Sequence, residues 1–102
     1  MISMSLGSHN IAYVQHKWLT IASLGMTNFK MALNTNRVNQ LVAFLKSNVS
    51  EDITNLQDMY LSKQKNEDGI LLQIAFHGCS SEIPIHKHQI NGFCNLLLNW
   101  QS

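Results

Sequence analysis

The chain contains an internal repeat, and this feature limits the possible folds more strongly than any local propensity does. The segment Leu19-Thr20-Ile21-Ala22 matches Leu72-Gln73-Ile74-Ala75 at an offset of 53 residues. After a one-residue slip the offset becomes 52, and the apolar positions still agree. A repeat of this length predicts two similar structural units in tandem. The later matched pairs are Met31/Ile83, Leu33/Ile85, Val38/Ile90, Asn39/Asn91, Leu41/Phe93, Val42/Cys94, Phe44/Leu96 and Leu45/Leu97.

Each copy begins with alternating apolar residues, the pattern of a strand with one face in a core. Residues 19–22 and 70–76 form the first strand of their copies, and Gly25 and Gly78 follow in predicted turns. A second alternating stretch comes next in each copy. In the second copy it contains Pro84, which predicts an edge strand or a strand start because proline cannot donate to a strand ladder.

A helix closes each copy, because apolar residues then recur at helical spacing. The first helix is expected over residues 37–48, with Thr35 or Asn36 as its N-cap. The second continues to about residue 100. Upstream of each copy lies another possible strand, at 11–15 and at 59–64, the latter leading into a strong turn signal at residues 66–69.

These elements predict an α+β fold in one domain, residues 1–102. Two tandem ββα units, which become βββα if the upstream strands form, are expected at about 10–48 and 58–100. We expect them to build one antiparallel sheet with two helices on one face, related by a pseudo-two-fold axis. Residues 47–58 are expected to form a packed connection between the units.

Composition places the chain among globular proteins, since 45% of residues are hydrophobic and 13% charged. No apolar run approaches the ~18 residues of a membrane span, and the start lacks the features of a signal peptide, so a cytoplasmic location is expected. Cys79 and Cys94 lack CxxC spacing and are expected to be free thiols packed as small apolar groups. No cofactor is expected.

The charges are distributed unevenly along the chain. Residues 1–50 carry four basic residues and no Asp or Glu, whereas residues 51–102 carry three lysines and six acidic residues. The first half could therefore attract an acidic partner, or copies of the chain could stack head to tail. A chance segregation of so few charges is an equally valid interpretation.

Catalytic and metal chemistry find little support in the sequence. The chain has no nucleophile elbow, no HExxH motif and no phosphate-binding glycine loop, so no enzymatic activity is expected. His77 and Cys79 are expected near the turn of a hairpin, and His86 and His88 near its open end, roughly 10 Å away, too far to share a metal. His86 and His88 alone are the remaining metal candidates, and a metal-dependent activity there is a third functional hypothesis.

The sheet face turned away from the helices is a better candidate for binding. If Leu19, Ile21, Met31 and Leu33 face the helices, then Trp18, Thr20, Ala22, Lys30, Ala32 and Asn34 face outward. An aromatic side chain with cations nearby can stack on bases and neutralise phosphates, as single-strand binding proteins do. A structural role for Trp18, in shielding the sheet or filling a dimer interface, is the alternative. The candidate nucleic-acid-binding residues are Trp18, Lys17, Lys30, Arg37 and Tyr13.

The segment Lys30-Met31-Ala32-Leu33-Asn34 before helix 37–48, in a tandem strand-rich unit closed by a helix, resembles the transcriptional coactivator and Whirly class of single-strand binders. The resemblance covers about 20 residues in each half and consists of apolar positions. It implies a strand-rich sheet that binds single-stranded nucleic acid.

The second helix has a wider apolar face than the first, because Leu98 and Trp100 stand where the repeat has Lys46 and Asn48. These residues could cover the N-terminal segment or the connection, or they could form a partner surface with Leu96. The primary functional hypothesis is therefore a non-enzymatic interaction protein, such as an inhibitor, immunity protein or accessory subunit, that forms a dimer or binds a protein partner. Single-stranded nucleic-acid binding is the alternative.

Overall fold

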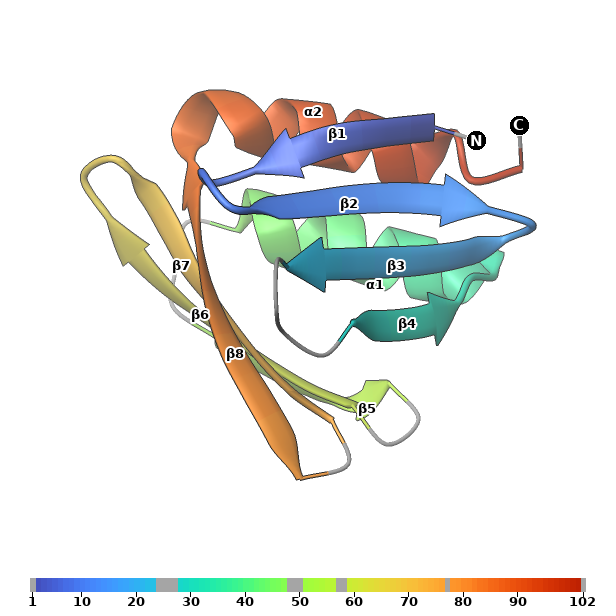
Figure 1. Ribbon diagram of the computed structural model, residues 1–102, viewed down its shortest axis with the longest axis horizontal. Helices are drawn as coiled ribbons and strands as arrows, with labels where there is room; N and C mark the ends of the chain where they lie inside the picture. The colour runs from blue at the N-terminus through green and yellow to red at the C-terminus, as the bar shows by residue number, and fades with distance from the viewer. Residues whose placement is uncertain (1, 24–27, 48–50, 57–58, 77, 102) are drawn as a thin grey trace.

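The chain folds as two successive four-stranded meanders, each followed by a helix (Figure 1). The computed structural model describes residues 2–23, 28–47, 51–56, 59–76 and 78–101. The first unit comprises β1 (Ile2–Leu6), β2 (Asn10–Gln15), β3 (Trp18–Ser23), β4 (Phe29–Ala32) and α1 (Thr35–Lys46). The second comprises β5 (Glu51–Leu56), β6 (Met59–Asn66), β7 (Gly69–Phe76), β8 (Cys79–His86) and α2 (Lys87–Leu98).

The predicted α+β class is confirmed, but the prediction of a single sheet is wrong. The strands form two antiparallel sheets, in the orders β1-β2-β3-β4 and β5-β6-β7-β8. Short turns join strands that pair within each sheet, whereas α1 separates β4 from β5, so β5 starts a new sheet. The repeating unit is ββββα rather than ββα or βββα.

The two missed strands lie at the start of each unit. The stretch expected to be a packed connection, residues 47–58, contains β5, and the N-terminal segment forms β1. Pro84 lies in β8, the edge strand of the second sheet, as its missing N–H predicts. Gly78 precedes β8 with a φ of 79°, which is consistent with the predicted turn, whereas Gly25 lies outside the described residues.

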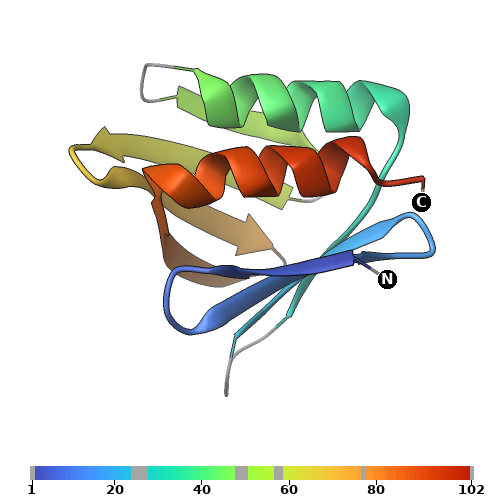
Figure 2. The same cartoon turned by 90° about the horizontal axis from the view of Figure 1, so that it is seen from above.

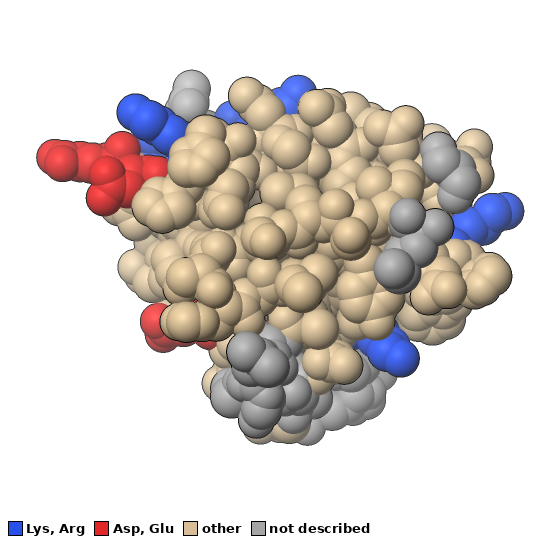
Figure 3. Space-filling view, turned by 45° about the horizontal axis from the view of Figure 1, so that its top comes forward, with Lys and Arg blue, Asp and Glu red and all other residues tan. Residues whose placement is uncertain are grey.

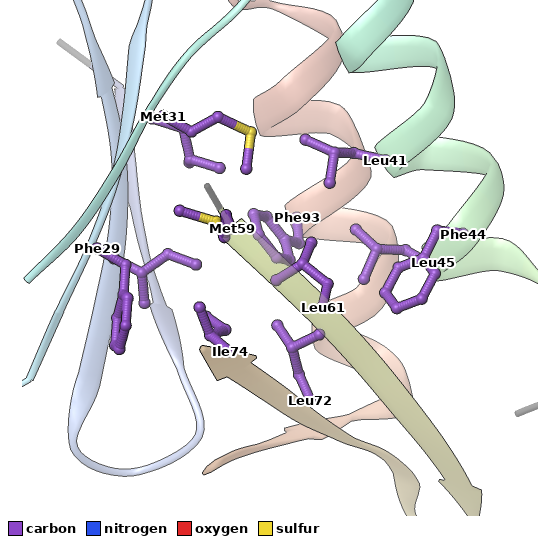
Figure 4. Close-up of a pocket in the computed structure, with 12 residues that line it drawn as sticks. Phe29, Met31, Leu41, Phe44, Leu45, Met59, Leu61, Leu72, Ile74 and Phe93 are labelled. Atoms are coloured by element: carbon purple, nitrogen blue, oxygen red, sulfur yellow. The ribbon is translucent and has the colours of Figure 1, made fainter. Parts of the chain in front are cut away.

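The hydrophobic core lies between the inner faces of the two sheets and the two helices, which run side by side in Figure 2. The repeat-related residues Leu19 and Leu72, and likewise Ile21 and Ile74, are all buried there. Burial of such a side chain contributes about 1.5–3 kcal/mol. Figure 4 shows apolar side chains from both sheets and both helices pointing into the same central space, which they line as a small apolar cavity.

The first helix begins two residues earlier than the sequence predicts, at Thr35 instead of residue 37. Asn34, rather than Thr35 or Asn36, is the N-cap of α1, and its side-chain oxygen accepts a 2.8 Å hydrogen bond from the backbone N–H of Arg37. This bond satisfies a donor that has no partner within the helix. The helix then ends at Lys46.

Gln89 ties the start of α2 to the first unit. Its Oε1 accepts hydrogen bonds of 3.2 Å from the backbone N–H groups of Gly7 and His86, and its Nε2 donates to the Ser5 carbonyl at 3.4 Å. Gly7 has a φ of 61°, and a Cβ there would lie 2.6 Å from the Pro84 carbonyl oxygen. The two sheets therefore meet closely at this corner, and glycine is required there.

Lys63 is buried among apolar side chains and is 1% exposed. Its Nζ donates to the backbone carbonyls of Phe44 and Ser47, and lies 5.1 Å from the centre of the Phe44 ring. Carbonyls at a helix C-terminus lack partners within the helix and carry partial negative charge. Lys63 therefore caps α1 from the neighbouring sheet.

None of the helices in the described residues is long and apolar enough to cross a membrane.

Candidate functional site

The outer face of the first sheet carries a row of side chains that crosses all of its strands. Ser3 pairs with Tyr13, Tyr13 with Thr20, and Thr20 with Lys30. Directly paired residues in antiparallel strands point to the same face. Since Leu19, Ile21 and Met31 are buried on the other face, the predicted division of inward and outward residues on these strands is confirmed.

Trp18 lies beside this row and is 48% exposed. It pairs with Gln15 on one side and with Ala32 on the other. A shallow depression opens next to it on the same face, lined by Tyr13, Gln15, His16, Trp18, Thr20 and Lys30. Thr20 is only 3% exposed because its short side chain lies at the bottom of this depression, between larger neighbours. Such a surface combines an aromatic plane, hydroxyl and amide groups, and a cation.

The remaining predicted cations, Lys17 and Arg37, lie at the edge of this surface. Lys17 precedes Trp18 in the chain, and its carbonyl accepts a 2.8 Å hydrogen bond from the N–H of Leu33. The Arg37 Nη1 donates at 2.5 Å to the carbonyl of Ala32, the strand partner of Trp18. The fold therefore brings Tyr13, Trp18 and Lys30 together at the depression on the outer face. Lys17 lies in the adjoining turn, and Arg37, in the first turn of α1, lies beside them at the β4 edge. We call Tyr13, Trp18, Lys30, Lys17 and Arg37 the outer-face cluster.

The turn that presents Lys17 has an unusual backbone. His16 and Lys17 have φ values of 54° and 65°, between the paired residues Gln15 and Trp18. A two-residue hairpin turn of this kind favours Asn and Gly, because other residues pay roughly 1–2 kcal/mol in the left-handed region. The chain therefore keeps a histidine and a lysine next to Trp18 at a cost in stability.

The first sheet carries no acidic side chain, because residues 1–50 contain none. In Figure 3 the visible acidic side chains lie at the left, the end at which Figure 1 places the β6–β7 hairpin. The basic side chains at the right-hand end have no acidic neighbours on the face shown. The charged side chains that the first sheet itself carries are therefore all basic, which would attract an anionic ligand.

The predicted partner surface on α2 is mostly occupied by the protein itself. Leu96 is buried in the core, and Trp100 is partly buried against it, whereas Leu98 is 52% exposed. The wide apolar face of α2 packs against β1: a Cβ at Gly92 would lie 3.2 Å from Cε of Met4. This part of α2 therefore covers β1, whereas Leu98 stays exposed.

The histidines and cysteines do not assemble into a metal site within the described residues, although His77 lies outside them. The rings of His86 and His88 stack with their centres 5.3 Å apart and their planes 16° apart. Ring nitrogens bind a metal in the plane of the ring, so stacked rings do not direct both nitrogens at one point. Of the two free thiols, Cys94 is buried as predicted, but Cys79 is exposed.

Burial raises the pKa of the Cys94 thiol above its ordinary value, and the nearby Lys46 ammonium lowers it by a smaller amount. A thiol with a raised pKa is a weak nucleophile at neutral pH. Cys94 therefore acts as a small apolar core residue.

Three residues that line the depression were not predicted from the sequence as site residues: Gln15, His16 and Thr20. The signal for Thr20 was present, since it alternates with buried residues on the same strand as Trp18. His16 and Gln15 could be placed only once the register of β2 with β3 was known. Ile11, 51% exposed, adds an apolar group to the same face and was also missed.

Comparisons of this chain with models of protein families, with curated proteins and with solved structures find no match.

Proposed function

We propose that this protein is a non-enzymatic binding protein that holds single-stranded nucleic acid on the outer face of its first sheet. The observation that carries the proposal is the half-exposed Trp18 next to Tyr13 and Lys30, on a sheet with no acidic residue. Bases of any sequence can stack on an aromatic plane, and each such contact contributes about 1–3 kcal/mol. Lys17, Lys30 and Arg37 would then contact the phosphates.

The hydroxyl row adds polar contacts without adding charge. Ser3 and Tyr13 lie on neighbouring strands in register, and their hydroxyls can donate to or accept from base edges or sugars, whereas Thr20 is buried beneath its neighbours. A sheet of four strands is roughly 15–19 Å wide at the usual strand spacing. The face therefore suits a short stretch of an unpaired strand, whose bases are free to stack, better than a rigid duplex.

Binding of a fluorescently labelled oligonucleotide of about 12 nucleotides tests this function. Anisotropy titrations with single-stranded DNA and RNA, at two salt concentrations, should show binding that weakens as salt rises. With three phosphate contacts, the slope of log K against log salt should be about −2. An absence of binding to both oligonucleotides at low salt would falsify the proposal.

Two matched variants, one on each sheet, test which sheet binds the oligonucleotide. Trp18→Ala should weaken binding at least tenfold, because it removes the stacking plane. Leu71 occupies the equivalent place in the second sheet, since it pairs with Pro84 as Trp18 pairs with Ala32. Leu71→Ala should leave the affinity unchanged. An equal loss in both variants would point to a general loss of structure rather than to a site.

A protein-binding function remains the second candidate, supported by the exposed Leu98. An interface centred there would bury this side chain against a second copy or another protein. Light scattering would test self-association directly: a dimer that becomes monomeric in Leu98→Lys would favour this function. A monomeric wild-type protein would remove the dimer from consideration.

A further inference from the structure

A second group of basic residues lies at the β6–β7 hairpin end of the molecule, away from the β2–β3 turn (Figure 1). A groove runs between the end of α1, the β6–β7 hairpin and the first turns of α2. Lys46, Lys65 and Lys87 line it, one from each of these three elements. Three of the seven basic residues of the chain thus line one groove, together with the acidic Glu67, which Asp68 follows in the hairpin. We call it the three-lysine groove.

The floor of the groove is apolar. Leu45 and Ile70 are buried side chains that contribute to its lining, and Ile90 is half-buried beside them. Asn66 and Asn91 add amide groups that can donate or accept hydrogen bonds. The space within the groove amounts to about 540 Å³. A cleft of this size with an apolar floor and a few polar groups is typical of small-molecule sites.

The walls of the groove are held in place before any ligand binds. Gly69 has a φ of 151°, and a Cβ there would lie 2.0 Å from the carbonyl oxygen of Ile85, so the hairpin packs tightly on the end of β8. The Asp68 carbonyl accepts a 2.8 Å hydrogen bond from the N–H of Lys87, the first residue of α2. The hairpin and α2 therefore keep a fixed spacing, which reduces the entropic cost of binding.

We propose that the three-lysine groove binds a small phosphate-bearing molecule of the nucleotide class. Lysines bind phosphate as point charges, and three of them around one groove suit a ligand with more than one negative charge. The apolar floor suits a ligand that also carries a flat, weakly polar body, such as a nucleobase. This site is independent of the single-strand surface, because it shares no residue with the outer-face cluster.

Titration of the protein with ADP, followed by NMR of the backbone amides, tests this inference. ADP should cause saturable shifts centred on residues 45–47, 65–70 and 87–91. Inorganic pyrophosphate should bind the same residues at least several-fold more weakly, because it lacks the body that covers the apolar floor. Equal affinities for ADP and pyrophosphate would overturn the nucleotide assignment.

Variants at exposed positions are used because these substitutions should not disturb folding. Lys65→Ala and Lys87→Ala should each weaken ADP binding about tenfold, whereas Lys17→Ala and Trp18→Ala should not change it. These last two variants lie in the outer-face cluster, so they distinguish failure of this site from failure of the proposed function. The inference is overturned if ADP causes no saturable shift up to about 10 mM, or if its shifts are lost in Trp18→Ala.

Discussion

The outer faces of the two sheets differ in chemistry although their strands pair in the same way. Thr20 pairs with Lys30 in the first sheet, and the repeat-related Gln73 pairs with Glu82 in the second. The Gln73 amide donates a 3.2 Å hydrogen bond to the Glu82 carboxylate, so these two polar side chains of the second sheet bond to each other. The first sheet instead offers a cation beside an aromatic plane. The comparison indicates that the fold tolerates either chemistry, and that a binding function has to be sought where the units differ.

One inner position also differs between the units. Val14 pairs with Leu19, and Lys63 pairs with the repeat-related Leu72, so Lys63 occupies in the second sheet the place that Val14 has in the first. Both are buried, but only Lys63 reaches the carbonyls at the end of α1. This lysine joins the helix of the first unit to the sheet of the second, a contact that has no counterpart at Val14.

The largest effect is expected at Lys63. Lys63→Ala should lower the free energy of unfolding by about 3–4 kcal/mol, because it leaves a cavity and removes hydrogen bonds from helix-end carbonyls. Lys63→Met, which keeps most of the side-chain volume, should lower the free energy of unfolding by a smaller amount. Denaturant unfolding of both variants measures this difference. A loss below about 1 kcal/mol in Lys63→Ala would contradict the capping role.

Substitutions at the hairpin turns of the two units should change the stability of the protein in opposite directions. Gly69→Ala should destabilise the protein by more than about 2 kcal/mol, because its Cβ would overlap the Ile85 carbonyl. Lys17→Gly should stabilise it by about 0.5–1 kcal/mol, because glycine relieves the left-handed strain. Thermal unfolding measures both changes.

Gly78→Ala is the control for these turns, since Gly78 has a φ of 79° but open space around its Cβ. It should cost about 1 kcal/mol, the strain without the overlap. A Gly69→Ala variant no less stable than Gly78→Ala would show that the hairpin can move away from β8.

Charge reversal at equivalent surface positions of the two sheets should affect oligonucleotide binding only in the first sheet. Lys30→Glu should weaken oligonucleotide binding several-fold at low salt and make the salt slope shallower by about 0.7. Glu82→Lys, on the second sheet, should not weaken binding. Anisotropy titrations at three salt concentrations would measure both, and a similar loss in both variants would contradict a site confined to the first sheet.

The smallest effect is expected at Cys94, whose repeat-related residue is Val42. Because the folded protein raises the thiol pKa, the unfolded chain ionises first as pH increases above the ordinary value of about 9.0. The stability linked to this group is therefore fully present below that pH and is lost as pH rises through the raised pKa. Unfolding free energies measured from pH 8 to pH 10.5 should fall more steeply for the wild type than for Cys94→Val. Equal slopes would contradict the raised pKa.

Much of the fold could be predicted because apolar periodicity reflects burial directly. The alternation predicts that Leu19, Ile21 and Met31 face the helices, and all three are buried around the same small cavity as Leu41 and Phe44 of α1. The candidate surface followed from the same alternation, since Trp18 and Lys30 had to point the other way. The N-cap was misplaced because Asn34, Thr35 and Asn36 are all suitable capping residues, and only the backbone geometry selects Asn34.

The sequence by itself determined the two-unit repeat, the inward and outward faces of the strands and the uneven distribution of charge, because each of these is a local pattern of residue types. Only the tertiary structure decided that the strands divide into two sheets, since pairing depends on which edges meet after α1 turns the chain. It also decided that Lys63 reaches the end of α1 and that three lysines distant in sequence line one groove. Such contacts join elements far apart in the chain, and no local pattern encodes them.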